Sequence, residues 1–131
     1  MKRVWLKSGG YLVIEPTEAL TVIDVNTGKY DGSKNVEETF ALINREAAQE
    51  TARQIRLRNL SGIILIDFIN QKDRQAAKEL LEELRSLCKD DPVPVRVVDI
   101  TALGLVELTR KKVKGTLAEQ LKGLKPTGVQ R

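Results

Sequence analysis

The stretch Gly62-Ile63-Ile64-Leu65-Ile66-Asp67-Phe68-Ile69 decides how the fold of this chain is interpreted. It is a continuous apolar run that contains one acid, Asp67, and it starts at a glycine that is expected to end the preceding helix. A short apolar run without alternation is typical of a strand buried on both faces in the parallel part of a sheet. The run therefore predicts an α/β fold with this strand in its interior.

Helical patterns lie on both sides of this run. Upstream, Asn35 has the character of an N-cap, with Glu38 three residues later as a capping box requires, and apolar or small residues then recur at spacings of three and four up to Ile55. Downstream, residues 90–92 stop a second amphipathic helix, whose inner face is expected at Ala76, Ala77, Leu80, Leu81, Leu84 and Leu87.

Strand patterns complete the order of elements. Segments 11–15 and 19–25 are separated only by Pro16-Thr17-Glu18, which favours an antiparallel hairpin. Two further strands are predicted at 93–100 and 105–108. The order β-β-α-β-α-β predicts an α/β fold, a mixed β-sheet with helices packed on it, and the length of 131 residues fits a single domain.

Composition excludes several kinds of chemistry. The chain has no His, so it has no imidazole base and no His metal ligand, and its one Cys excludes an internal disulfide and a Cys-cluster zinc site. Aromatic residues make up only 4%, which is too few for a stacking platform of several rings, so Trp5 and Tyr11 are expected to pack. No apolar run is long enough to span a membrane, and a lone thiol without an export signal favours the cytoplasm.

Charge is concentrated near the end of the chain. Residues 110–131 hold seven basic side chains and one acid, whereas the remainder holds 15 basic and 17 acidic residues. A basic tail on a near-neutral body suggests a polyanionic partner, and a solvated terminus explains it equally well. Arg110, Lys111 and Lys112 are the candidate RNA-binding residues, as a clamp for phosphates, with a solvated charge run as the alternative.

Two acids and one amide form the candidate site. Asp67 interrupts the central run, and Asp24 also ends an apolar run, two residues before Asn26 on the same face of a strand. If the strands with Asp24 and Asp67 are neighbours, about 4.8 Å apart, their carboxylates can share one ion. These hard oxygen donors suit Mg²⁺ or Mn²⁺, and such an ion helps to hydrolyse a phosphate ester. The alternative, in which the acids cap helices or pair with Arg, stays open.

The chain resembles the ribonuclease E/G family. The resemblance covers about residues 8–115, and the forms N-T-G at 26–28 and A-L-G-L-V-E at 102–107 are closer to the ribonuclease G branch. The matching stretches occur in the family's order and spacing at 8–14, 17–28, 46–48, 52–60, 62–69 and 103–112.

The resemblance implies specific roles. Residues 1–115 would form the catalytic, DNase I-like domain, and residues 116–131 would form a basic tail, with a short helix expected at 116–121. Asp24 and Asp67 would be the Mg²⁺ ligands, and Asn26 would support the metal or the scissile phosphate. The implied activity is metal-dependent endonucleolytic cleavage of single-stranded RNA in RNA processing and turnover.

Three departures from the family pattern qualify this interpretation. The family's further RNA-binding domains do not fit into 131 residues, so a fragment of a longer enzyme is expected, and that full-length enzyme could form a homo-oligomer. The Cys-Pro-x-Cys zinc link is missing, so no zinc is expected. Asn70 stands where the family pattern has an acid, which would weaken the metal site. The alternatives are an RNA-binding or assembly module without activity of its own, and a purely structural domain.

Overall fold

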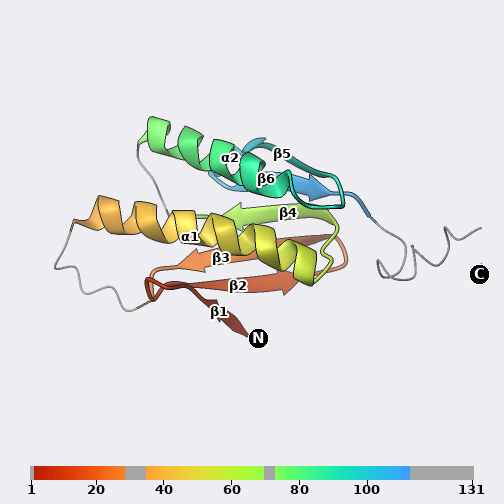
Figure 1. Cartoon of the computed structure of the whole chain (residues 1–131), viewed down its shortest axis with the longest axis horizontal. Helices are drawn as coiled ribbons and strands as arrows, with labels where there is room; N and C mark the ends of the chain where they lie inside the picture. Colours follow the sequence, from red (N-terminus) through yellow and green to blue (C-terminus); the bar gives the residue numbers. More distant parts are fainter. Residues whose placement is uncertain (1, 29–34, 70–72, 113–131) are drawn as a thin grey trace, which may run out of the picture.

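The structure, a computed structural model, describes residues 2–28, 35–69 and 73–112 (Figure 1). It confirms the predicted α/β architecture, a mixed sheet with two helices in one domain. Asn70, the basic tail 116–131 and the expected helix 116–121 lie outside the described residues. The elements, in chain order, are β1 (Arg3–Trp5), β2 (Tyr11–Pro16), β3 (Leu20–Asn26), α1 (Val36–Leu57), β4 (Gly62–Asp67), α2 (Arg74–Cys88), β5 (Val95–Ile100) and β6 (Val106–Arg110).

The described strands form one sheet in the order β1-β2-β3-β4-β6-β5. The expected hairpin is present as the antiparallel pair β2–β3, and the expected interior strand is β4, which is parallel to β3 and antiparallel to β6. The arrowheads of β3 and β4 point the same way in Figure 1. The short edge strand β1 was not predicted, because three residues are too few to show a pattern.

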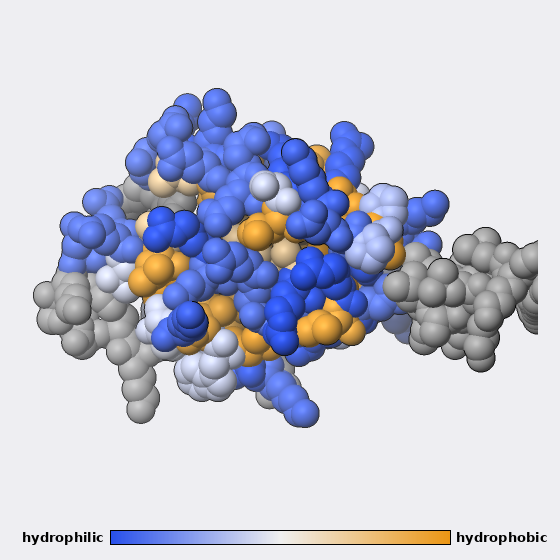
Figure 2. Space-filling model, in the orientation of Figure 1, coloured by the Kyte–Doolittle hydropathy of each residue, from blue (hydrophilic) through white to orange (hydrophobic). Residues whose placement is uncertain are grey.

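Both helices lie on one face of the sheet (Figure 1). On that face Ile64 and Ile66 are fully buried, as is Ile23 of β3. The opposite face, called the open face below, carries the alternate residues of each strand. The expectation that β4 is buried on both faces is therefore wrong: Ile63 is 42% exposed, because no described helix covers it. The outer surface on the helix side is largely hydrophilic, with apolar patches between the charged side chains (Figure 2).

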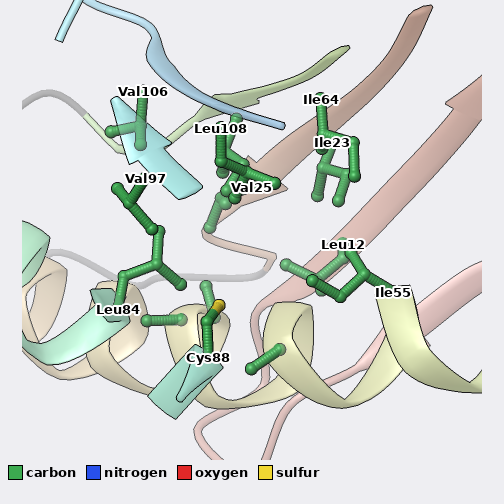
Figure 3. Packing of buried hydrophobic residues seen from close by; sticks show 14 of the residues in the cluster. Leu12, Ile23, Val25, Ile55, Ile64, Leu84, Cys88, Val97, Val106 and Leu108 are labelled. Carbon is green, nitrogen blue, oxygen red and sulfur yellow. The ribbon is translucent and has the colours of Figure 1, made fainter. Parts of the chain in front are cut away.

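The core fills the space between the helices and the sheet. Ile55 of α1 and Leu84 and Cys88 of α2 lie over the apolar side chains of the strands (Figure 3). Burying a side chain of the size of Leu or Ile contributes roughly 1.5–3 kcal/mol, so this layer holds both helices on the sheet. The labelled strand residues that they meet are Leu12, Ile23, Val25, Ile64, Val97, Val106 and Leu108.

Helix α1 begins where the sequence predicts and ends earlier than expected. At its start the prediction is confirmed: the Asn35 side chain accepts a hydrogen bond from the Glu38 amide at 3.1 Å. At its end the expected stop at Gly62 is wrong, because the helix ends at Leu57. Asn59 has a φ of 51° and takes the left-handed position that glycine usually occupies. The chain then continues directly into β4.

Candidate active site

Asp24 and Asp67 are register partners on the adjacent parallel strands β3 and β4. Because paired residues of neighbouring strands project to the same face, both carboxylates stand on the open face, with backbones about 4.8 Å apart. Asp67 is the last residue of β4, and Asp24 lies two residues before the end of β3. The two acids thus meet at the carboxyl ends of parallel strands, where open α/β sheets commonly bind their ligands.

The electrostatics of this pair favour a cation. Partial burial raises the pKa of Asp67 above its ordinary value, and the charge of Asp24 raises it further. Asn26 lies on the same face of β3, and its amide nitrogen is 3.4 Å from Asp24 Oδ2, at the long limit of a hydrogen bond. The repulsion between the two carboxylates is the kind of interaction that a bound cation removes.

The donor set fits a hard divalent ion that keeps most of its water. Asp24 and Asp67 would supply carboxylate oxygens, and the Asn26 side chain, whose amide nitrogen faces Asp24, also carries an amide oxygen. Mg²⁺ is bound in many proteins through one or two carboxylates and retains several waters. Among the described residues no group of three or more His, Cys, Asp or Glu side chains is placed to hold a metal. The Asp24 and Asp67 carboxylates would therefore be the acidic protein ligands of such a site, with water completing the coordination.

Asn44 of α1 holds the chain just beyond Asp67, and the sequence analysis missed it. The side chain is fully buried, donates to the Ile69 carbonyl at 3.0 Å and accepts from the Ile69 amide at 2.9 Å. These two bonds fasten the end of β4 to the helix and so restrict where Asp67 can lie. A polar residue within the apolar stripe, directly after Ile43, was the signal that could have identified it.

Two glycines bring the loops beside β3 into close contact. A Cβ atom on Gly28 would overlap the Gly9 carbonyl oxygen, and one on Gly10 would lie 2.7 Å from the Asn26 carbonyl oxygen. Gly28 also has a φ of +70°, which side-chain-bearing residues rarely adopt. The glycines of the S-G-G and N-T-G stretches are thus explained by close packing at the end of the strand that carries Asp24 and Asn26.

Arg110 corrects the predicted phosphate clamp. Its side chain is buried and paired with Asp91, at 2.8 Å from Nε to Oδ2 and 3.0 Å from Nη2 to Oδ1. The remaining nitrogen, Nη1, donates to Asn59 Oδ1 and to the Leu60 carbonyl. All three guanidinium nitrogens are therefore engaged inside the protein. Sequence reasoning failed here because a basic residue beside two lysines has the pattern of a surface run.

Lys111 and Lys112 are exposed, as a phosphate contact requires, but they lie far from the acids. β6 runs antiparallel to β4, with Arg110 opposite Gly62, so both lysines follow the end of the sheet where β4 begins. Five residue steps separate Gly62 from Asp67, which corresponds to about 17 Å along the strand. The lysines thus stay predicted RNA contacts at the opposite end of the sheet.

Comparison with known proteins identifies the family. The sequence model of the Ribonuclease E/G family matches residues 1–113. This chain belongs to the ribonuclease E/G family. Its relatives include ribonuclease E of Nostoc sp. strain PCC 7120, with 50% identity over 110 residues, or 84% of this chain and 16% of the relative. Ribonuclease G of Escherichia coli K12 is 44% identical over 126 residues, or 96% of this chain and 26% of the relative.

This member of the ribonuclease E/G family corresponds to a small part of its curated relatives. Ribonuclease G of Haemophilus influenzae strain Rd is 47% identical over 120 residues, which are 92% of this chain and 24% of that protein. Both branches of the family thus occur among the relatives, and the branch predicted from the N-T-G and A-L-G-L-V-E forms stays a prediction. Across the described residues, no helix is both long and apolar enough to pass through a membrane.

Proposed function

We propose that this chain is a metal-dependent endoribonuclease domain that cleaves single-stranded RNA as part of a longer enzyme. The proposal is supported by membership of a family whose matched relatives are named ribonuclease E and ribonuclease G. The observation that carries it is the register pairing of Asp24 with Asp67 on the open face. This chain has no His, and a carboxylate pair that holds a cation can activate water without one.

In this proposal each polar group has a defined task. Asp24 and Asp67 hold a Mg²⁺ or Mn²⁺ ion, and Asn26 orients Asp24 or contacts the scissile phosphate through its amide. When bound, such an ion lowers the pKa of a coordinated water and polarises the phosphodiester. Asn44 keeps the end of β4 in place through its two bonds to Ile69. Lys111 and Lys112 attract the RNA backbone at the far end of the sheet.

A second candidate function is an RNA-binding or assembly module that does not cut RNA on its own. Two observations favour it. The described residues bring only two carboxylates together at the site, and the chain spans only 16% to 26% of the length of the relatives described above. If the remaining parts of such an enzyme grip the RNA, this domain alone would hold its strand too weakly for efficient cleavage.

Metal titration tests the proposed ion site without requiring activity. Thermal unfolding of the whole chain is measured with increasing Mg²⁺ and Mn²⁺, and both ions are expected to raise the melting temperature. Asp67→Asn is expected to abolish that rise. Glu15→Gln, which changes an exposed acid on β2, two strands from β4, is the matched control and is expected to keep it. Equal metal-dependent stabilisation in both variants would contradict the ion site.

RNA cleavage separates the two candidate functions. A 5′-labelled single-stranded oligoribonucleotide is incubated with the purified chain and Mn²⁺, with the Asp67→Asn variant and with EDTA. Cleavage that requires both Asp67 and the metal supports the endoribonuclease proposal. Saturable binding to intact RNA, with no cleavage under any of these conditions, supports the module. RNA affinity should also fall with added salt, since the exposed lysines act through phosphate charges.

A further inference from the structure

An exposed cation–aromatic cluster, here called the Arg3 cluster, stands at the edge of the open face. It consists of Arg3 and Trp5 of β1 and Tyr11 of β2. The two ring centroids are 5.1 Å apart with an interplanar angle of 55°. The Arg3 guanidinium carbon lies 4.4 Å from the Tyr11 ring centroid and 5.9 Å from that of Trp5. The three side chains thus form one contiguous group.

Trp5 is the most informative member of the cluster, because it is 61% exposed although it contacts Tyr11. Trp is on average one of the more buried residue types, so a half-open indole on a three-residue edge strand costs the fold some apolar burial. Trp5 thus packs against Tyr11 and Arg3, as expected, but it is not part of the core. Arg3 lies closer to the Tyr11 ring than to the Trp5 ring, and the exposed part of the Trp5 indole is the aromatic surface available to a ligand.

The cluster lines a hollow of about 550 Å³, within the range of small-ligand sites. Ser8, Thr27 and Thr39, which carry hydroxyl groups, also line it. The Ser8 hydroxyl donates to Glu46, and Thr39 belongs to α1, so the hollow extends from the open face around the end of the sheet. An aromatic face, a cation and several hydroxyls are together what a nucleotide requires: a ring for the base to stack on, a positive charge for the phosphate, and groups that hydrogen-bond base edges or ribose.

The sheet register connects this hollow to the carboxylate pair. Trp5 pairs with Tyr11, which pairs with Asn26, and Arg3 pairs with Val13, which pairs with Asp24. Members of each row project to the same face, so the Arg3 cluster and the acids share the open face. Two strand spacings, or about 10 Å, separate Arg3 and Trp5 from Asp24 and Asn26, whereas Tyr11 is the direct register partner of Asn26. One RNA strand can therefore reach both places.

We propose that the Arg3 cluster is a nucleotide subsite that stacks one base of single-stranded RNA on Trp5 and holds an adjacent phosphate with Arg3. The RNA ligand rests on the proposed function, whereas the subsite itself rests on the exposure of Trp5, the hollow and the shared face. The Lys111–Lys112 pair lies at the other end of the sheet. The subsite therefore supplies the positive charge nearer to the carboxylates.

The single Trp in the sequence makes the proposal directly measurable. The whole chain is titrated with a short single-stranded oligoribonucleotide in EDTA, so that cleavage does not interfere, while Trp5 fluorescence is recorded. Stacking is expected to quench the emission saturably. An abasic oligomer with the same number of phosphates is expected to quench weakly and to bind about 5- to 150-fold less tightly, the loss that one stacked base represents. Equal binding of the two oligomers would overturn the proposal.

Variants locate the contact, with affinity read from the anisotropy of a labelled oligonucleotide. Trp5→Leu is expected to weaken binding by the same factor, whereas Trp5→Phe keeps a ring and retains most of the affinity. Leu57→Ala removes another exposed apolar side chain, 64% exposed at the far end of α1, and is expected to leave affinity unchanged. Unchanged affinity in folded Trp5→Leu, confirmed by circular dichroism, would overturn the proposal.

Arg3 has its own matched control in Lys2, an exposed neighbour with the same charge. Arg3→Gln is expected to weaken binding more than Lys2→Gln, because only Arg3 contacts the rings. Equal losses of RNA affinity in the two variants would show that only the net charge of this segment matters. They would overturn the assignment of Arg3 as a phosphate contact.

The fluorescence test of the Arg3 cluster does not depend on the proposed metal site. Quenching is expected to persist in Asp67→Asn. Quenching of the native chain by RNA, with neither metal-dependent stabilisation nor cleavage of RNA by that chain, supports the subsite and rejects the endoribonuclease proposal. Cleavage without quenching rejects the subsite alone. Trp5 fluorescence that responds to protein concentration and never to RNA would identify the cluster as a protein interface and would also overturn the proposal.

Discussion

Arg110 and Asp91 form a bidentate ion pair that is closed off from solvent, with side chains 3% and 0% exposed. The pair joins the end of β6 to the segment that leads into β5, and the bonds from Arg110 to Asn59 and Leu60 add the end of α1. It therefore fixes three chain segments where β4 begins. The sequence pattern indicated that Arg110 is a surface residue that contacts phosphate, whereas in the structure it is buried and holds these segments together.

Loss of Arg110 is expected to destabilise the fold strongly. Arg110→Met leaves the Asp91 carboxylate buried without its partner, which typically costs about 3–5 kcal/mol. Lys111→Met, a neighbouring exposed cation, is the control and should change the free energy of unfolding by less than about 0.5 kcal/mol. Urea denaturation followed by circular dichroism measures both.

The double variant Asp91→Leu/Arg110→Met tests the cause of that loss. Because it leaves no unpaired charge, it should be more stable than Arg110→Met alone. Purely additive losses from the two substitutions would show that the cost arises from packing and not from the orphaned carboxylate.

Asn44→Ala should lower both stability and proposed metal binding. It removes the bonds to both polar groups of the Ile69 backbone and should cost about 2 kcal/mol. Since those bonds hold the chain after Asp67, the Mn²⁺-dependent rise in melting temperature should also shrink. Gln49→Ala, an exposed change on the same helix, should alter neither. If Asn44→Ala is destabilised but its Mn²⁺-dependent rise in melting temperature is unchanged, Asn44 does not position the metal site.

Gly28→Ala and Gly62→Ala should differ although both glycines have positive φ, +70° and +78°. At Gly62 a Cβ meets nothing within 4 Å, so only the left-handed backbone costs energy, roughly 1–2 kcal/mol. At Gly28 it also meets the Gly9 carbonyl oxygen, so the loops must separate. The larger loss of stability is expected at Gly28, and equal midpoints in urea would argue against close contact of the two loops.

Asp67→Asn should not destabilise the metal-free protein near neutral pH. Desolvation and the Asp24 charge raise the pKa of Asp67, so its protonated form is favoured in the fold. That favourable contribution is complete below the ordinary pKa of Asp and is lost as pH rises through the raised folded value. The melting temperature of Asp67→Asn relative to the native chain should therefore increase from about pH 4 to pH 7.

Thermal unfolding in EDTA across this pH range measures the effect, with Glu15→Gln as the control for removing one negative charge. A melting temperature of Asp67→Asn that falls below that of the native chain at pH 7 would show that the ionised Asp67 stabilises the fold through a partner and is not repelled by Asp24.

Local patterns were sufficient for the elements and for the candidate acids. The Asn35 cap, the helical spacing after it and the hairpin of β2 and β3 depend on neighbours in the chain, so the sequence predicts them. Asp24 and Asp67 could be selected because each lies in or at the end of an apolar run where a charge is out of place. Their pairing depended on β3 and β4 being neighbours, which only the folded sheet establishes.

Burial, by contrast, was decided by tertiary structure. The sequence carries Ile63, Trp5 and Arg110 without indicating what covers them, and in the fold the two apolar side chains are exposed while the charged one is enclosed. The physical reason is that solvent exposure depends on which face of the sheet the helices occupy and on partners distant in the chain. For Arg110 that partner is Asp91, 19 residues away in sequence. The local periodicity of the sequence shows neither which face of the sheet the helices cover nor which distant residue is the partner.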